Sequence, residues 1–197
     1  MKVPNSSLST SAAYILFAMG MMLSSPGHTQ DVIVLANYQD VTQWLESEGW
    51  WGEEKRSEQL KVPRALITGI SPDWRKESQA LVVAEKKEIF YRLILPLVVH
   101  ANEMVLNRRQ RMQAISYNLE SGKPMSEEDL DFMRNVAVQL RIVDQERAMA
   151  LDADEPQWLG LIDTALYRLD VIPAGLVLGQ AAYESGYGTS RFASAGN

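Results

Sequence analysis

Apolar side chains recur at steps of three and four in the middle of the chain, which is the spacing of one helix face. The pattern predicts a helix over residues 76–119 whose buried face comprises Phe90, Leu93, Ile94, Leu97, Val98, Ala101, Met104 and Val105. Pro96 lies inside this run and removes one backbone donor. We therefore expect the helix to be kinked or split in two at the proline.

A second helix is predicted to begin just after Ser126. Ser126 is suited to cap this helix, Asp129 stands at its third position, and Met125 can contact Leu130 across the first turn. Together the two helical segments are predicted to form an antiparallel pair. The alternative is a coiled-coil or partner-binding hairpin, although the apolar stripe is short for a coiled coil.

Two further helices are predicted towards the C-terminus. An acidic run at residues 152–156 precedes the first of them, over residues 155–169. We expect Asp154 to cap it, because acidic side chains favour the positive end of a helix, and a cation site is the alternative. The last helix, over residues 173–184, is nearly uncharged, so we expect it to be buried on most sides. Its small residues should allow close packing against neighbours: Gly175, Gly179, Ala181 and Ala182.

Residues 31–80 show no sustained period and are predicted to be irregular, with residues 32–36 forming a short strand or the start of a helix. This segment holds Trp44, Trp50 and Trp51. We interpret them as aromatic anchors beside a solvated acidic face, and acid–base chemistry or a cation site is the alternative. The neighbouring carboxylates are Glu46, Glu48, Glu53 and Glu54.

The first 30 residues are predicted to be a signal peptide. Lys2 and a polar stretch precede an apolar run at residues 12–23, and helix-breaking residues follow it. A membrane span needs roughly 20 apolar residues, so the shorter run is typical of a signal-peptide core. No Ala-x-Ala site is present, and a cut near Gln30 is our expectation. We thus expect an exported protein of the periplasm or cell envelope without a stable membrane span, and the alternative is an uncleaved N-terminal anchor.

Composition and charge narrow the function classes. The hydrophobic fraction of 46% and the charged fraction of 22% are those of a globular protein. A net charge of −6 argues against a nucleic-acid partner, which needs a basic surface. The chain has no cysteine, and its two histidines, His28 and His100, are far apart in sequence. Thiol chemistry is excluded, and we expect no metal site and no cofactor.

Glu184 is the candidate catalytic residue. It stands at the end of the last predicted helix, directly before a turn that contains Gly186 and Gly188. The negative end of the helix dipole and partial burial should both raise the pKa of this carboxyl, which is what a glycosidase acid requires. The glycines should leave room for a ligand, and Tyr187 offers a ring for a sugar face.

A family resemblance supports this assignment. Residues 172–197 read IPAGLVLGQAAYESGYGTSRFASAGN. The run resembles the glucosaminidase family of bacterial cell-wall hydrolases, also described as mannosyl-glycoprotein endo-β-N-acetylglucosaminidase-like, through its Gln-Ala-Ala and Glu-Ser-Gly-Tyr-Gly-Thr-Ser motifs. Residues 90–103, FYRLILPLVVHANE, look like the helical region of the Bax-like branch. The two matches cover roughly residues 85–197, and Tyr187 stands where tryptophan is common in the family.

The resemblance implies an α+β lysozyme-like fold in the full family and an endo-β-N-acetylglucosaminidase that cleaves β-1,4 bonds of the peptidoglycan glycan strand. Glu184 matches the catalytic acid. Tyr187 is a candidate for substrate binding, and Thr189 and Ser190 match positions that shape the turn, with Ser190 capping a next short helix. The implied organisation is a signal peptide (1–30), an irregular segment (31–80), a helical region (81–153) and the first part of a glucosaminidase domain (154–197).

Only thirteen residues follow Glu184, and neither a second catalytic group nor a groove wall is evident among them. We therefore expect this portion to be C-terminally truncated, mainly α-helical and inactive by itself. Two alternatives stay open. One is a non-catalytic cell-envelope module that binds a glycan or a protein partner, and the other is a peptidoglycan amidase.

Overall fold

The computed structural model describes residues 31–51, 61–70, 73–154 and 156–190. Contacts divide the chain into two units, Met1–Asp31 and Val32–Asn197, and the architecture below is that of the second. The predicted signal peptide lies outside the described residues, as do Glu53 and Glu54.

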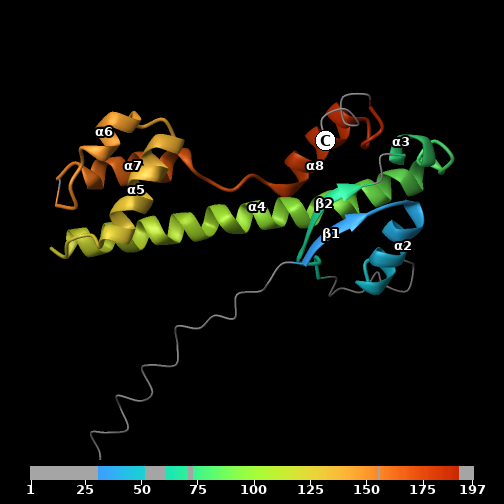
Figure 1. The fold of residues 1–197 in the computed structure, drawn as a ribbon, viewed down its shortest axis with the longest axis horizontal. Helices are drawn as coiled ribbons and strands as arrows, with labels where there is room; N and C mark the ends of the chain where they lie inside the picture. The colour runs from blue at the N-terminus through green and yellow to red at the C-terminus, as the bar shows by residue number, and fades with distance from the viewer. Residues whose placement is uncertain (1–30, 52–60, 71–72, 155, 191–197) are drawn as a thin grey trace, which may run out of the picture. The chain divides into compact units, whose positions relative to one another are not determined.

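The described chain is mainly helical, which confirms that part of the prediction (Figure 1). Its elements are β1 (Asp31–Leu35), α2 (Tyr38–Ser47), β2 (Ala65–Ile70), α3 (Trp74–Glu77), α4 (Val83–Glu120), α5 (Glu127–Gln139), α6 (Gln145–Met149), α7 (Trp158–Arg168) and α8 (Ala174–Ser185). Strands β1 and β2 form a two-stranded sheet. Residues 31–80 are therefore more regular than their sequence pattern indicated. Of the two alternatives for residues 32–36, the strand is correct, since residues 32–35 belong to β1.

Helix α4 is one continuous element of 38 residues, with Pro96 inside it. Of the two outcomes expected at Pro96, a kink or a split, the split does not occur. The helix also starts at Val83, later than predicted, because residues 74–77 form the separate short helix α3 and a turn intervenes.

The first half of α4 packs against the β-sheet, α2 and α3. Buried side chains from these elements form one apolar cluster, comprising Leu35, Val41, Leu45, Trp50, Ile67, Trp74, Ile89 and Leu93. The interpretation of the tryptophans as anchors is confirmed for Trp50, which is only 6% exposed, and Trp44 and Trp51 pack against the same cluster. Glu46 and Glu48 are exposed beside them, as expected of a solvated face.

The second half of α4 carries another apolar cluster, formed with α5 and α7 and centred on Met112, Met133, Trp158 and Ile162. The predicted cap of α5 is confirmed, since the Asp129 amide donates to the Ser126 hydroxyl at 3.1 Å. Helix α4 contacts both α7 and α8, while α5 packs mainly on α6 and α7. The simple antiparallel pair of α4 and α5 was therefore incomplete.

The acidic run before α7 does not act as predicted. Gln157 occupies the N-cap position of α7, so the expectation that Asp154 caps this helix was wrong. The helix begins three residues later than the sequence suggested, and Asp154 lies in the preceding turn. Among the described residues, no group of three or more acidic or histidine side chains is arranged to hold a metal ion.

Within the described part of the chain, α4 is the one helix with the length and composition to cross a membrane. The core helices of globular domains share these properties, and α4 contributes buried side chains to both apolar clusters. We therefore treat α4 as a core helix.

Candidate functional site

Helix α8 places the candidate acid, and it is held on α4. Two hydrogen bonds join the Asn102 amide to the main chain of Ile172, just before α8: Asn102 Nδ2 donates to the Ile172 carbonyl at 2.8 Å, and the Ile172 amide donates to Asn102 Oδ1 at 3.1 Å. The face of α8 that is turned inward carries its more buried residues, namely Ala174, Val177, Leu178, Ala181, Ala182 and Ser185. Of these, Ala182 is the most buried.

The opposite face of α8 is open. Leu176 is 63% exposed and Tyr183 is 91% exposed. A Cβ atom added at Gly175 or Gly179 would meet nothing within 4 Å. The prediction that α8 is buried on most sides was therefore wrong for the described chain, and its two glycines do not serve close packing here. A low charge content reports composition, and it does not reveal whether another element covers the helix.

Glu184 lies on this open face. Its side chain is exposed, and its Oε1 accepts a hydrogen bond from Gln180 Nε2 at 3.0 Å, one helical turn earlier. The partial burial that we expected around the carboxylate is absent. The position of Glu184 is nevertheless fixed by helix α8, which carries it, and by the turn that follows.

The turn after α8 is tightly bonded. Gly186 ends the helix in the left-handed conformation, with φ 57° and ψ 44°, and the Tyr187 amide donates back to the Ala182 carbonyl in a Schellman-type cap. Ser185 Oγ donates to the Ala181 carbonyl at 2.6 Å and accepts from the Gly188 amide at 2.9 Å. Thr189 Oγ1 donates to the Gly186 carbonyl at 2.6 Å, so Thr189 shapes the turn as predicted. The helix that Ser190 was predicted to cap lies outside the described residues.

Tyr187 docks this turn on α4. Its backbone is left-handed, with φ 59°, which is costly for a residue with a side chain. Its ring contacts Phe90 and Tyr91 edge-on, with centroid distances of 5.6 Å and 5.9 Å, and Lys87 Nζ lies 5.0 Å from its centroid. The Tyr91 hydroxyl, and then the Lys87 ammonium, lower the pKa of Tyr187, and the same hydroxyl contact raises the pKa of Tyr91.

Gly188 was expected to leave room for a ligand, and the structure corrects this. A Cβ atom added there would lie 3.3 Å from Trp74 Nε1 and 3.8 Å from Phe90 Cδ2. The glycine lets the turn approach protein side chains, and they already occupy the space.

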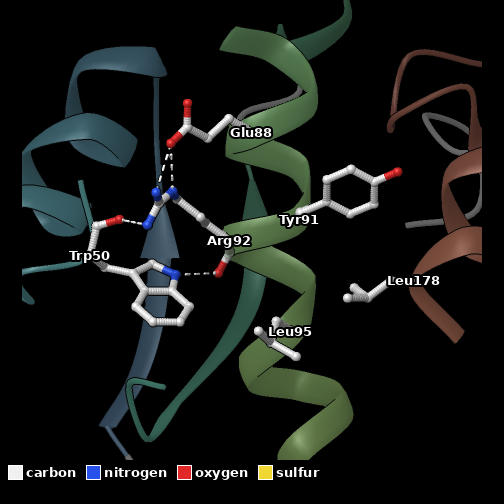
Figure 2. A pocket seen from close by; sticks show the side chains of 6 residues that line it. All are labelled: Trp50, Glu88, Tyr91, Arg92, Leu95 and Leu178. Carbon is white, nitrogen blue, oxygen red and sulfur yellow. Dashed lines mark hydrogen bonds and ion pairs between the residues drawn. The ribbon is translucent and has the colours of Figure 1, made fainter. Parts of the chain in front are cut away.

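A groove with a volume of about 500 Å³ lies beside this turn. Its floor is α4, with Glu88, Tyr91, Arg92 and Leu95, and its sides are Trp50 and Leu178 of α8. Figure 2 shows Trp50 on one side of α4, and Tyr91 pointing towards α8 on the other. We name these six residues the α4 groove.

The charged side chains of the α4 groove are paired with each other. Arg92 donates to Glu88 Oε1 from Nε at 3.1 Å and from Nη2 at 2.7 Å, and its Nη1 donates to the Trp50 carbonyl. The guanidinium carbon lies 5.5 Å from the centroid of the Trp50 ring. The groove is thus largely apolar and close to neutral.

Sequence reasoning did not identify the α4 groove. The spacing of Glu88 and Arg92 at i and i+4 on a helix was the available signal for their ion pair. No pattern among neighbouring residues indicated that Trp50 would contact Arg92, which is 42 residues away in the sequence.

The structure also places the basic residues and the histidines. Arg109 donates to the Leu166 and Leu169 carbonyls, and Arg111 donates to the Asp129 carboxylate, so both guanidinium groups join α4 to neighbouring segments. His100 is half-buried in α4, and His28 lies outside the described residues.

Comparison with protein-family models, with curated proteins and with solved structures found no significant match to this chain.

Proposed function

We propose that this chain carries the general acid of a peptidoglycan hydrolase, an endo-β-N-acetylglucosaminidase that cleaves β-1,4 glycosidic bonds, and that Glu184 is that acid. The observation that carries the proposal is the placement of Glu184. It is the last carboxylate of α8, and its side chain is oriented by Gln180. Hydrogen bonds among residues 182–190 hold the turn that follows it.

The exposure of Glu184 is compatible with this role. A glycan laid across the open face of α8 would exclude water from the carboxylate, and desolvation favours the protonated form that a general acid needs. The exposed ring of Tyr183 on the same helix face offers an apolar platform for a sugar. In this proposal the main role of Tyr187 is to hold the turn against α4 by packing on Phe90 and Tyr91, and its contact with substrate is secondary.

The wider proposal includes a lysozyme-like α+β fold in the full family and export to the periplasm or cell envelope. A glycosidase also needs a second carboxylate, or the acetamido group of its substrate, to stabilise the positive charge that develops on the sugar ring in the transition state. The acetamido group of N-acetylglucosamine supplies this function chemically, so Glu184 is sufficient as the protein acid under that mechanism.

The test is release of reducing ends from purified peptidoglycan by the natural protein and by its Glu184→Gln variant. General acid catalysis contributes about 10²- to 10⁴-fold, so the variant should lose about that much of the rate. Glu120→Gln is the matched control, because Glu120 is also an exposed carboxylate at the C-terminal end of a helix. Retention of activity in Glu184→Gln would remove Glu184 from the mechanism, and freed stem peptides without new reducing ends would indicate an amidase.

A second candidate is a non-catalytic envelope module, which the open apolar face of α8 favours. Exposed Leu176 and Tyr183 resemble a contact surface more than a catalytic cleft. Under this alternative the protein would sediment with insoluble peptidoglycan and release no soluble product, and the Glu184→Gln variant would sediment equally well.

A further inference from the structure

We infer that the α4 groove is a binding subsite for an uncharged amino-sugar unit, and this inference rests on the proposed function. The volume of about 500 Å³ lies within the range of about 300–1,000 Å³ that is usual for small-molecule sites. The groove combines this volume with aromatic walls and a fixed pair of charged groups.

The charges select the class of ligand. Glu88 and Arg92 neutralise each other, and Arg92 is further engaged by the Trp50 carbonyl. An anion would have to displace Glu88 from Arg92, and a cation would have to displace Arg92 from Glu88, so both are disfavoured. A neutral ligand leaves the pair intact and meets the groove without that cost.

The walls select the shape of the ligand. Tyr91, Leu95 and Leu178 present carbon surface, which suits the C–H face of a pyranose and the methyl of an acetamido group. Glu88 and Arg92 also line the groove, and their polar atoms are of the kinds that pair with the hydroxyl and amide groups of an amino sugar. A purely apolar ligand would gain no hydrogen bond from these polar groups when it covered them.

The groove is connected to the Glu184 turn. Tyr91 forms part of the groove and contacts Tyr187, which follows Glu184 by three residues. Leu178 and Glu184 stand on one helix, six residues or about 9 Å apart along its axis. Because Glu184 lies on the other face of α8, the groove holds a sugar unit next to the cleaved bond rather than the bond itself.

The experiment measures binding of the trisaccharide of N-acetylglucosamine to the chain by calorimetry or NMR titration. Leu178→Gln should weaken binding by about tenfold or more, because it removes apolar contact from one wall. Leu176→Gln is the matched control, since it makes the same change on the exposed face of α8. Tyr91→Ala provides a second variant of the groove, and thermal unfolding establishes that each variant is folded.

The outcomes separate this inference from the proposed function. The subsite is overturned if the trisaccharide does not bind, or if Leu178→Gln and Leu176→Gln bind it equally well. In each of those cases, loss of reducing-end release on Glu184→Gln would still leave the proposed hydrolase standing.

Discussion

The carbonyl of Arg92 accepts a hydrogen bond from the indole Nε1 of Trp50 at 3.1 Å. In an uninterrupted helix this carbonyl would accept from the amide four residues later, but that residue is Pro96, which has no N–H. Trp50 thus supplies the donor that the proline removes. This pairing explains how α4 continues through a buried proline, and it fixes one wall of the α4 groove.

Trp50→Phe should therefore destabilise the fold, by about 1–2 kcal/mol for the unpaired carbonyl in addition to the smaller ring. The diagnostic measurement is a double-mutant cycle with Pro96→Ala in urea unfolding. An alanine restores the helical donor to Arg92, so Trp50→Phe should cost less in the Pro96→Ala background, with a coupling of about 0.5 kcal/mol or more.

Trp44→Phe is the control for ring size, because the buried Nε1 of Trp44 has no hydrogen-bond partner among the described residues. Its replacement should show no coupling to Pro96→Ala. An additive cycle for Trp50 and Pro96 would contradict the assigned role of Trp50.

Asn102→Ala should loosen α8 from α4. The substitution removes both hydrogen bonds to Ile172, which together contribute about 1–2 kcal/mol. Amide exchange in α8 should become faster while exchange in α5 and α7 stays unchanged. Asn107→Ala, at an exposed position of the same helix, should be neutral or slightly stabilising because alanine favours helices. Equal effects of the two substitutions would show that the Asn102 bonds do not hold α8.

Gly188→Ala and Gly179→Ala should change stability in opposite directions. Gly188 has φ +76°, and an added Cβ would lie 3.3 Å from Trp74 Nε1, so alanine should cost about 1–2 kcal/mol. Gly179 lies within α8 with open space around it, and alanine there should stabilise the helix by about 0.5–1 kcal/mol. Chemical denaturation of both variants tests the pair, and a neutral Gly188→Ala would show that the turn does not rest on Trp74.

Local signals in the sequence predicted the parts of the fold that depend on neighbouring residues. The Ser126 cap was predictable because its partner Asp129 is three residues away, and the predicted bounds of α8, 173–184, differ from the observed ones by one residue at each end. The pairing of Trp50 with Arg92 spans 42 residues and that of Asn102 with Ile172 spans 70. Such contacts depend on tertiary packing, which no local pattern encodes.

The candidate site shows the same division. Glu184 and its glycine turn were recognisable from sequence because the motif is continuous along the chain. The exposure of Glu184 could not be predicted from sequence, because it depends on whether another element covers the outer face of α8. The α4 groove was missed because its walls come from three separate segments.

Tyr38 should give the fold a measurable dependence on alkaline pH. Its hydroxyl donates to Glu85 on α4, and this bond, followed by burial, raises the pKa of Tyr38 from 10.0 to about 12. The folded state therefore holds the phenol proton more tightly than the unfolded state does, so the contribution to stability is fully present below about pH 10 and is lost as the pH rises towards 12. Urea unfolding between about pH 9 and pH 12 should show a steeper loss of stability for the native chain than for Tyr38→Phe, which has no proton to lose. Tyr117→Phe, at a 68% exposed position of α4, should follow the native chain. Parallel losses for the native chain and Tyr38→Phe would mean that the bond to Glu85 does not link α2 to α4 in solution.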